Sequence, residues 1–290
     1  MKLIILGSTG LLGNTITKYF FENPNYKTKA IIRDSTKTLF FKNEYQDNFL
    51  IINNILDFSV LEKHISAFMP DLIINCIGVT NKFSMKKLFY INESILINAY
   101  LPNKLYEICS KFGIRLIQFS TDCVFSGKKG KYTEKDNPDP LDIYGKSKLL
   151  GEINFENSIT IRKSVIGHEL ASARGLLEWF LCQENSVNGF KNVLFSGLTV
   201  LELARIIEIY IIPKKNLRGV IHISGNTISK YDLLEIISKV YKKSIKIIPT
   251  QTVKIDRSLN CDFFKELTNY QAPAWTDLIQ SMYNFNKLSE

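Results

Sequence analysis

The sequence predicts an α/β protein in which a doubly wound parallel sheet is joined to a smaller C-terminal α/β lobe. Two observations lead to this fold class. Short apolar, β-branched runs alternate with longer segments whose apolar residues recur at intervals of three and four, and the first run leads into a glycine-rich turn. Strands that are apolar throughout and separated by helices need crossover connections and cover on both faces, as in a parallel sheet. Such a sheet binds its ligands at the carboxyl ends of its strands.

Strands and helices are expected in alternation along the chain. The strands are predicted at residues 2–6, 28–33, 49–53, 71–76, 115–120, 160–162, 219–224 and 245–249, and the helices at 11–22, 58–68, 86–112, 143–154, 174–185, 200–212 and 230–243. After about residue 163 the pattern is less regular, because the segments 167–175 and 260–277 interrupt it. We therefore expect residues 1–163 to form the sheet domain, with 189–224 returning to it. Residues 164–188 and 225–290 would then form a substrate-binding lobe.

Composition limits the class of protein. The chain has 290 residues, close to half of them apolar, which allows a sizeable core. The formal net charge of +9 comes from lysines scattered along the chain, so we interpret it as background composition and expect no nucleic-acid partner. The five cysteines stand singly, and we predict no metal site. Because we find neither a leader sequence nor an apolar run of roughly 18–20 residues, we expect a cytoplasmic protein without a membrane span.

The first chemical signal is the turn "GSTGLLG" between the first strand and the first helix. Gly7, Gly10 and Gly13 are spaced as G-x-x-G-x-x-G, where a tight turn, a close backbone approach and helix packing each exclude a Cβ atom. Free N–H groups at the start of the helix attract a pyrophosphate. The pattern predicts a Rossmann-type dinucleotide site, to which the intervening residues Ser8, Thr9, Leu11 and Leu12 also belong.

The residues after the second and third strands bear on the choice of cofactor. Arg33 stands where an NAD enzyme of this kind would offer an acidic residue to the ribose 2′-hydroxyl, and a guanidinium suits a 2′-phosphate. The adjacent Asp34 could still serve the hydroxyl, so NADPH is favoured over NADH without excluding it. Asp57 is placed to meet the adenine edge, to cap the following helix, or to do both.

The second chemical signal is "YGKSK". Tyr144 and Lys148 are four residues apart, so on a helix they share one face and can converge on one ligand. A nearby ammonium and an oxidised nicotinamide would both favour the phenolate, which predicts a tyrosine pKa lowered from about 10. Such a pair can protonate a carbonyl oxygen while hydride arrives at its carbon.

Four stretches carry a resemblance to a known family: "GSTGLLG", "NCIGVT", "FSTDCVFSGKKGKYTEKDNPDPLDIYGKSKLLGE" and "GVIHISG". Together they resemble the extended short-chain dehydrogenase/reductases and, within these, the dTDP-4-dehydrorhamnose reductase family, closely up to about residue 165 and more loosely beyond it. The resemblance implies an NADPH-dependent reduction of a 4-keto-6-deoxy hexose carried on UDP or dTDP, of the L-rhamnose type or its 2-acetamido analogue. The resemblance does not decide whether the protein forms a homodimer.

The resemblance also implies residue roles. Thr121 matches the residue that hydrogen-bonds the substrate carbonyl, Tyr144 the proton donor, and Lys148 the residue that holds the nicotinamide ribose. Asn98 matches a helix Asn of the active-site network, although a lone Asn there could equally be an exposed polar residue. Further cofactor contacts are implied at Cys76, Ile77 and Gly78, and substrate contacts at Thr80, Asp122, Val124 and Phe125. Asp122 could instead steady the turn after the strand.

Cys123 departs from the rhamnose reductase pattern, which usually has an aromatic residue here. It resembles the catalytic Cys of GDP-L-fucose synthase and of plant UDP-4-keto-6-deoxyglucose 3,5-epimerase/4-reductase. A ketone at C4 acidifies the neighbouring C–H bonds, so a thiol or thiolate could exchange a proton at C3 before reduction. The resemblance suggests His168 as its partner. The alternatives are a small buried residue for Cys123 and an ordinary loop residue for His168.

The C-terminal lobe offers candidate substrate ligands. Arg174 suits diphosphate oxygens, Trp179 could stack on the base or lie in the core, and Ser196 belongs to a polar segment. A second class of function stays open, namely a non-catalytic NADP-binding regulatory subunit like the methionine adenosyltransferase β subunit, which resembles the same reductases. The Thr121, Tyr144 and Lys148 set favours the enzyme, because a binding role needs no acid at the nicotinamide.

Overall fold

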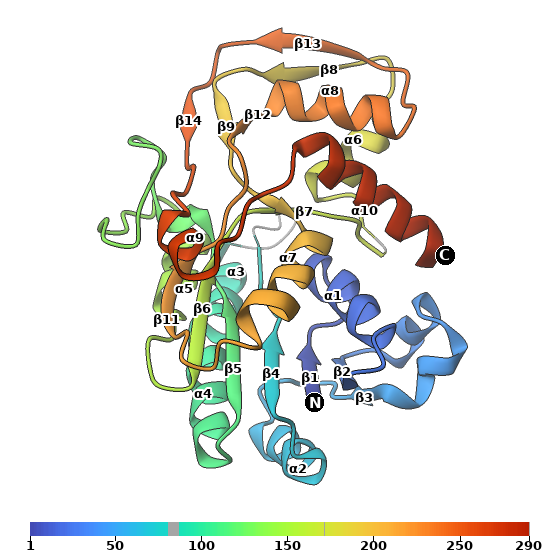
Figure 1. Cartoon of the computed structure of the whole chain (residues 1–290), viewed down its shortest axis with the longest axis vertical. Helices are drawn as coiled ribbons and strands as arrows, with labels where there is room; N and C mark the ends of the chain where they lie inside the picture. The colour runs from blue at the N-terminus through green and yellow to red at the C-terminus, as the bar shows by residue number, and fades with distance from the viewer. Residues whose placement is uncertain (81–86, 171, 290) are drawn as a thin grey trace.

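The structure, a computed structural model, describes residues 1–80, 87–170 and 172–289. A parallel sheet of seven strands lies at its centre, in the order β11-β6-β5-β4-β1-β2-β3 (Figure 1). The strands are β1 (Lys2–Leu6), β2 (Lys27–Ile32), β3 (Phe49–Ile51), β4 (Leu72–Asn75), β5 (Arg115–Phe119), β6 (Ser158–Arg162) and β11 (Gly219–His222). The order reverses beside β1, which is where a doubly wound sheet places its ligand.

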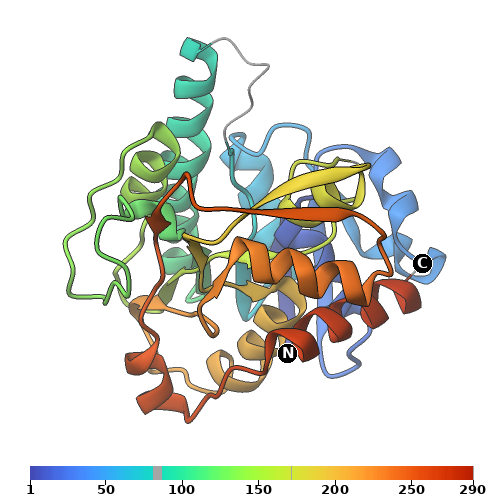
Figure 2. The same cartoon turned by 90° about the horizontal axis from the view of Figure 1, so that it is seen from above.

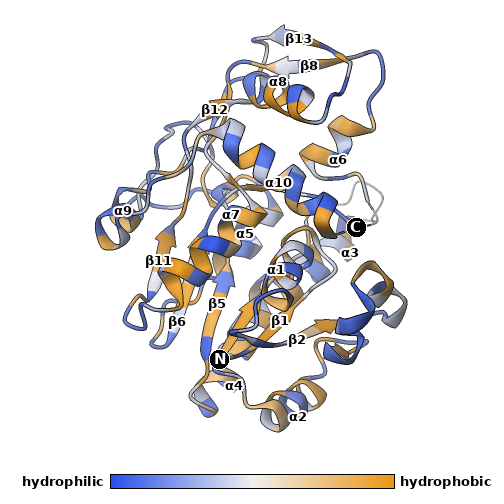
Figure 3. Ribbon diagram, turned by 45° about the vertical axis from the view of Figure 1, so that its right-hand side comes forward, coloured by the Kyte–Doolittle hydropathy of each residue, from blue (hydrophilic) through white to orange (hydrophobic). Residues whose placement is uncertain are grey.

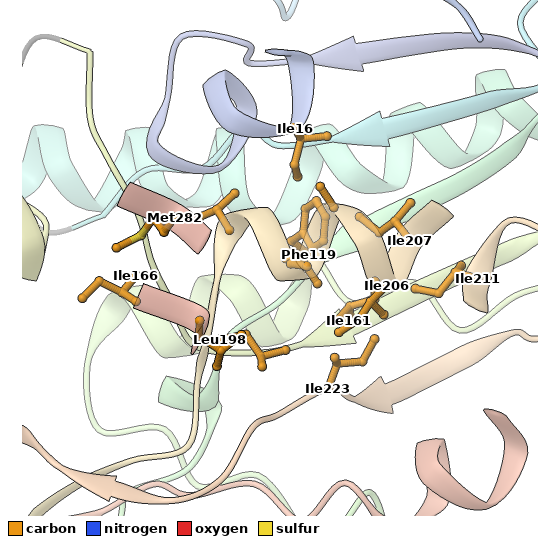
Figure 4. Close-up of a cluster of buried hydrophobic side chains, with 14 of the residues drawn as sticks. Ile16, Phe119, Ile161, Ile166, Leu198, Ile206, Ile207, Ile211, Ile223 and Met282 are labelled. Atoms are coloured by element: carbon orange, nitrogen blue, oxygen red, sulfur yellow. The ribbon is translucent and has the colours of Figure 1, made fainter. Parts of the chain in front are cut away.

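Helices cover both faces of the sheet, so each strand buries side chains on two sides. Leu3 and Ile5 of β1 pack into one core with α1 (Leu11–Phe21) and α7 (Val200–Ile206). Ile4 and Leu6 pack into a second core with α2 (Phe58–Phe68) and α4 (Leu101–Lys111). Figure 4 shows the first core, where side chains from α1, β5, β6 and α7 meet. This two-sided burial explains why the strands are mostly apolar, and β1 is orange along its length in Figure 3.

The smaller lobe lies beyond the carboxyl ends of the sheet strands (Figure 1). Its helices are α6 (Leu176–Leu181), α8 (Lys230–Val240) and α10 (Trp275–Ser289), and Figure 2 shows α8 in orange beside α10 in red. Short strands complete it: β7 (Val165–Ile166) pairs with β10 (Leu198–Thr199), β8 (Ser186–Phe190) with β13 (Lys246–Thr250), and β9 (Val193–Phe195) with β12 (Ile228–Ser229) and β14 (Ile255–Asp256). The helix α9 (Asp262–Thr268) lies against β11.

The predicted fold class and the seven sheet strands are confirmed, with ends that differ by a few residues. The strand predicted at 245–249 forms as β13 but pairs with β8 outside the main sheet. The segment 260–277, which interrupts the pattern in the sequence, contains α9 and the start of α10. Of the segment 189–224, α7 and β11 join the sheet domain, whereas β9 pairs with strands of the lobe.

The long helix predicted at 86–112 is divided into three parts. These are α3 (Lys87–Ser94), a π-helical stretch η3 (Ile95–Tyr100) and α4, and residue 86 itself lies outside the described residues. The π-helical stretch carries Asn98, and single π turns are frequent at functional sites. Across the described ranges, no helix is both long and apolar enough to cross a bilayer.

Candidate active site

The turn between β1 and α1 has the geometry that the glycine pattern predicts. Gly7 has a φ of 76°, and a Cβ atom there would lie 2.8 Å from the Cγ1 atom of Ile77. A Cβ atom on Gly13 would lie 2.1 Å from the carbonyl oxygen of Gly7, so the helix can approach the turn only without one. Gly10 is the N-cap residue of α1. The turn therefore presents backbone N–H groups and a helix N-terminus, which suit a pyrophosphate.

A cleft of about 410 Å³ begins at this turn. Among the predicted cofactor residues, its lining includes Gly7, Thr9, Gly10, Arg33, Cys76, Ile77 and Gly78. The other side of the cleft is formed by residues 53–56 after β3 and by Leu96 and Ile97 of η3, none of which was predicted as a cofactor residue. For residues 53–56, the sequence did contain a signal: the polar pair Asn53 and Asn54 comes directly after a strand, where a parallel sheet binds its ligands. The size and lining of the cleft fit a dinucleotide.

Some predicted cofactor residues support the turn instead of lining the cleft. Ser8 is buried and donates its hydroxyl hydrogen to the carbonyl oxygen of Ile5. Leu11 and Leu12 pack against the apolar core beneath α1. These residues fix the shape of the turn, and any contact with a cofactor would come from their backbone.

Two acidic residues near the cleft act as caps. The Asp57 carboxylate accepts hydrogen bonds from the Val60 N–H and the Ser59 hydroxyl. Of the two roles predicted for Asp57, an adenine contact and a helix cap, the structure therefore shows the cap. Asp34 likewise accepts from the backbone N–H and hydroxyl of Thr36, and these hydrogen bonds lower its pKa. Arg33 is exposed and lines the cleft, so it is better placed than Asp34 for a group on the ribose.

Two glycines bring α5 (Ile143–Leu150) close to its neighbours. A Cβ atom on Gly145 would lie 2.2 Å from the carbonyl oxygen of Cys123, and one on Gly151 would lie 1.8 Å from that of Asn98. The carboxylate of Asp142 caps the helix by accepting from the Gly145 N–H at 2.7 Å. The helix is thus held against both the turn after β5 and the η3 stretch. This places Lys148 beside Gly78, which lines the cleft, with Tyr144 one turn earlier on the same helix.

Lys148 is buried beside the segment that follows β4. A Cβ atom on Gly78 would lie 3.4 Å from its Nζ atom and 3.5 Å from the Oδ1 atom of Asn98. Burial, reinforced by the neighbouring ammonium of Lys163, lowers the pKa of Lys148 to about 7, and the Glu152 carboxylate opposes that shift. Lys148 therefore gains or loses its charge near neutral pH.

Asn98 connects the three parts of this site. Its Oδ1 atom accepts from the Val79 N–H at 2.8 Å, and its Nδ2 atom donates to the Val79 carbonyl at 2.8 Å and to the Ser147 hydroxyl at 3.1 Å. The side chain is fully buried. Asn98 thus links η3, the segment after β4 and α5, which agrees with a place in the active-site network and not with an exposed polar residue.

The pKa of Tyr144 differs from the prediction. Burial raises it above its usual range, the nearby Cys123 adds to the increase, and the neighbouring Thr121 side chain opposes it. The sequence predicts a lowered pKa from the ammonium four residues away, and this prediction is wrong because desolvation by burial is the largest cause of the shift. The hydroxyl of Tyr144 is therefore protonated, which suits a proton donor.

The strand end that carries Thr121 and Cys123 forms a capped turn, η4 (Asp122–Val124). Thr121 accepts from the Cys123 N–H at 3.1 Å and its hydroxyl donates to the Asp122 carboxylate at 3.1 Å, so Asp122 does steady the turn. The preceding Ser120 donates to Glu152 at 2.6 Å. Burial raises the pKa of the Cys123 thiol to about 12. The turn brings Thr121 and Cys123 together with Tyr144.

Other predicted residues lie outside this group. The ring nitrogens of His168 contact the Glu178 carboxylate at 2.6 Å and the Tyr241 hydroxyl at 2.8 Å, which leaves its predicted partnership with Cys123 without support. The side chains of Val124 and Phe125 are fully buried in a small core with Tyr132, so they offer no surface to a substrate.

The candidates from the lobe differ in exposure and in the partners that hold them. Ser196 is buried and accepts from the Leu259 N–H at 2.9 Å, so it connects two segments of the lobe. Arg174 is exposed, and its backbone N–H is held by Glu169. Trp179 is 37% exposed on α6, which does not fit a core residue.

Thr80, a predicted substrate residue of the sheet domain, is exposed at the end of the described stretch 1–80.

Three comparisons with known proteins bear on the family and the fold. A family model described as the RmlD substrate binding domain matches residues 1–285. A dTDP-4-dehydrorhamnose reductase from Aggregatibacter actinomycetemcomitans is 29% identical over 152 residues, which is 52% of this chain and 45% of that protein. The methionine adenosyltransferase 2 subunit beta of Danio rerio is 29% identical over 151 residues, 52% of this chain and 42% of that protein. The chain thus spans less than half the length of the curated relatives it matches.

Solved structures show the same fold over nearly the whole chain. A dTDP-4-dehydrorhamnose reductase from Bacillus anthracis, in complex with NADP, gives a TM-score of 0.78 at 19% identity and covers 98% of each chain. An orthologue from Clostridium acetobutylicum gives 0.76 at 22% identity, covering 99% of this chain and all of the other. These matches confirm the Rossmann-type fold, and the family match confirms the resemblance seen in the sequence. The chain belongs to the RmlD substrate-binding-domain family.

Proposed function

We propose that this protein is an NADPH-dependent reductase of a nucleoside-diphosphate 4-keto-6-deoxy hexose. The proposal is carried by two observations: Thr121 lies near Tyr144, and Lys148, one turn further along the same helix, is buried beside Gly78 of a dinucleotide-sized cleft. The family match and the reductases among the related proteins support the substrate class.

The cleft fits the cofactor because the glycine turn leaves room that a Cβ atom would fill. Gly7, Gly10 and Gly13 would hold the pyrophosphate, Arg33 the 2′-phosphate, and Lys148 the nicotinamide ribose. When bound, NADPH supplies the hydride that reduces the carbonyl carbon.

The protein's own residues handle the carbonyl oxygen. The hydroxyls of Thr121 and Tyr144 would both hydrogen-bond that oxygen, because the Thr121 side chain lies close enough to Tyr144 to influence its pKa. Tyr144 is protonated before reaction, so it can give its proton to the oxygen as negative charge develops there. The positive form of Lys148 would stabilise the phenolate that remains.

Substitution of Tyr144 by Phe tests this function. NADPH consumption is followed by absorbance with UDP- and dTDP-linked 4-keto-6-deoxy sugars, with and without a 2-acetamido group. We expect Tyr144→Phe to abolish turnover and to leave cofactor affinity within about tenfold. The control is Tyr106→Phe, whose ring stacks on Phe155 near the amino ends of the strands. Unchanged turnover in Tyr144→Phe would refute the catalytic assignment.

Epimerisation at C3 before reduction is a finer part of the proposal, and it rests on Cys123. The thiol is partly buried beside Thr121 and is protonated at neutral pH, so it can return a proton to an enolate next to the ketone. We expect solvent deuterium to enter C3 of the product and Cys123→Ser to suppress it. Cys182→Ser, which changes an exposed cysteine, is the matched control. Equal incorporation in Cys123→Ser would remove Cys123 from the mechanism.

A non-catalytic regulatory subunit is the second candidate, because the methionine adenosyltransferase β subunits match this chain as well as the reductase does. The protonated, half-buried Tyr144 near Thr121 favours catalysis. Turnover by the wild-type chain alone distinguishes the two, since a regulatory subunit would bind the dinucleotide without reducing any of the sugars offered.

A further inference from the structure

Three basic side chains come together beside the η4 turn: Lys163, Lys230 and Arg257. They belong to separate elements, because Lys163 follows β6, Lys230 begins α8 and Arg257 follows β14. Figure 1 shows the upper end of β6 beneath the lobe that contains β14 and α8. The sequence analysis assigned no role to any of them, since each is a single basic residue in a lysine-rich chain.

Lys163 lies deepest. It is 7% exposed, and its backbone oxygen accepts from the Asp122 N–H at 3.2 Å. Its ammonium lies 5.9 Å from the centre of the Phe119 ring. Burial lowers the pKa of Lys163, and the charges of Asp122, Cys76 and Cys123 oppose this. Lys163 thus lies between the cleft and the η4 turn.

Lys230 approaches the same turn from the lobe. Its ammonium lies 4.1 Å from the centre of the Phe195 ring, which fixes the side chain by a cation–π contact. Burial lowers its pKa to about 8, and Asp122 and Cys123 are again the charges that oppose the shift. Asp122 and Cys123 therefore act electrostatically on two ammonium groups from different elements.

Arg257 completes the cluster. Its Nε–H donates to the Phe125 carbonyl at 3.1 Å, and its NH1 atom lies 3.7 Å from the Sγ atom of Cys123. These contacts orient the guanidinium and occupy only part of its five N–H donors. The remaining donors are available to a ligand next to Cys123.

The charges of this cluster do not balance. Asp122 is the carboxylate that acts on both lysines, and in the part of the chain that the structure describes no ion pair involves Lys163, Lys230 or Arg257. Buried charges are costly unless they are paired. An anion bound between the three side chains would provide that pairing.

We propose that Lys163, Lys230 and Arg257 form a subsite for the sugar-linked phosphate of the nucleotide-sugar substrate. The inference rests on the proposed function, in which the sugar carbonyl lies at Thr121 and Tyr144. In a nucleotide-linked hexose, the C4 oxygen and the phosphate on C1 lie on opposite sides of the sugar ring. If the C4 oxygen is held at Thr121, the phosphate can therefore reach the region near Cys123. Arg and Lys both bind phosphate oxygens well.

The test is calorimetric binding of UDP, dTDP, the monophosphates and the free nucleosides to the NADP⁺-loaded protein, with no turnover required. We expect Lys230→Met and Arg257→Gln each to weaken diphosphate binding by about 10- to 100-fold, because a charged hydrogen bond is lost. Nucleoside affinity and NADP⁺ affinity should stay unchanged.

Matched controls separate the cluster from a general loss of charge. Lys191→Met removes an exposed lysine that lies 5.2 Å over the Tyr231 ring, and Arg218→Gln removes an exposed arginine paired with Glu156. Both controls should bind the diphosphates as the wild type does. The subsite is refuted if Lys230→Met and Arg257→Gln also bind them normally, or if the controls lose affinity equally.

Two further outcomes identify the anion and separate this inference from the proposed function. If the variants weaken UDP-glucuronate but not UDP, the cluster binds a sugar carboxylate, and the phosphate assignment is wrong. If Tyr144→Phe keeps full turnover while the variants lose diphosphate affinity, the catalytic assignment fails and the phosphate subsite stands.

Discussion

A Cβ atom added to Gly145 would lie 2.2 Å from the carbonyl oxygen of Cys123, so α5 rests directly on the backbone of the η4 turn. Tyr144 precedes this glycine, and Thr121 lies two residues before Cys123. The contact therefore sets the separation between the proton donor and the residue that would share the substrate oxygen with it.

Substitution of Gly145 by Ala tests this contact. The methyl group forces α5 and η4 apart, so we expect the free energy of unfolding to fall by about 1–3 kcal/mol and turnover to fall as Tyr144 leaves Thr121. Urea denaturation and steady-state assays measure the two effects. Lys146→Ala, at the next and exposed position of the helix, should change neither. Normal stability and turnover in Gly145→Ala would show that the contact does not position Tyr144.

The buried lysines predict how stability depends on pH. The folded pKa of Lys148 is about 7 and that of Lys230 about 8, both below the value of about 10.4 for an unfolded lysine. Between these values the unfolded chain binds protons that the folded chain does not, so their contribution to stability rises with pH from about 7 to about 10 and is lost below about 7.

Chemical denaturation without nucleotides, at pH values between about 6.5 and 9.5, measures this dependence. We expect Lys230→Met to be more stable than the wild type at the low end and to depend less on pH. Lys191→Met, an exposed lysine, should keep the wild-type slope. A Lys230→Met protein with an unchanged slope would mean that the folded state does not bury that charge.

Arg33 should decide the preference between the two dinucleotides. It is exposed at the end of β2 and lines the cleft, whereas the Asp34 carboxylate is held by Thr36. We expect Arg33→Ala to weaken NADPH binding by about 10- to 100-fold, since a charged contact to the 2′-phosphate is lost, and to leave NADH within about threefold. Fluorescence titration measures both affinities, and Arg218→Ala is the remote control. Equal losses for NADPH and NADH would argue against a 2′-phosphate contact.

The sheet domain was predictable because its signals are local. Leu3 to Leu6 are apolar at every position since alternate residues enter different cores, and this pattern is legible in the sequence. The glycines of the first turn and the spacing of Tyr144 and Lys148 are local in the same way. What the sequence could not show is how close α5 comes to η4 and η3, because Gly145 and Gly151 are defined by partners far along the chain.

The lobe was harder to predict. The helix α10 buries Leu278, Ile279 and Met282 at helical spacing, yet a proline and polar residues before it gave the segment an irregular pattern. The lysines and arginine near Cys123 are brought together only by the tertiary fold. Their pKa shifts come from burial, which no spacing rule reports.

Glu152 should act on the reaction through Lys148. Its carboxylate is buried, accepts from Arg162 at both oxygens at 2.8 Å and from Ser120 at 2.6 Å, and raises the pKa of Lys148 against the effect of burial. Neutralising Glu152 removes that support, so the pKa of Lys148 should fall further below about 7. Glu152 is thus a positioning residue and does not itself meet the substrate.

In the pH profile of kcat/KM, the change that reports the titration of Lys148 (the Lys148 limb) should move to lower pH in Glu152→Gln. Turnover at neutral pH should also fall. The variant also leaves Arg162 in a weakened pair, which costs about 3–5 kcal/mol of stability if the pairing is lost.

Ser120→Ala therefore serves as a second variant, because it removes one hydrogen bond to Glu152 and keeps the charge. It should lower stability slightly without moving the limb. Glu156→Gln, at an exposed position, should leave both unchanged. A Glu152→Gln protein that folds and keeps the wild-type pH profile would show that Glu152 supports the fold alone.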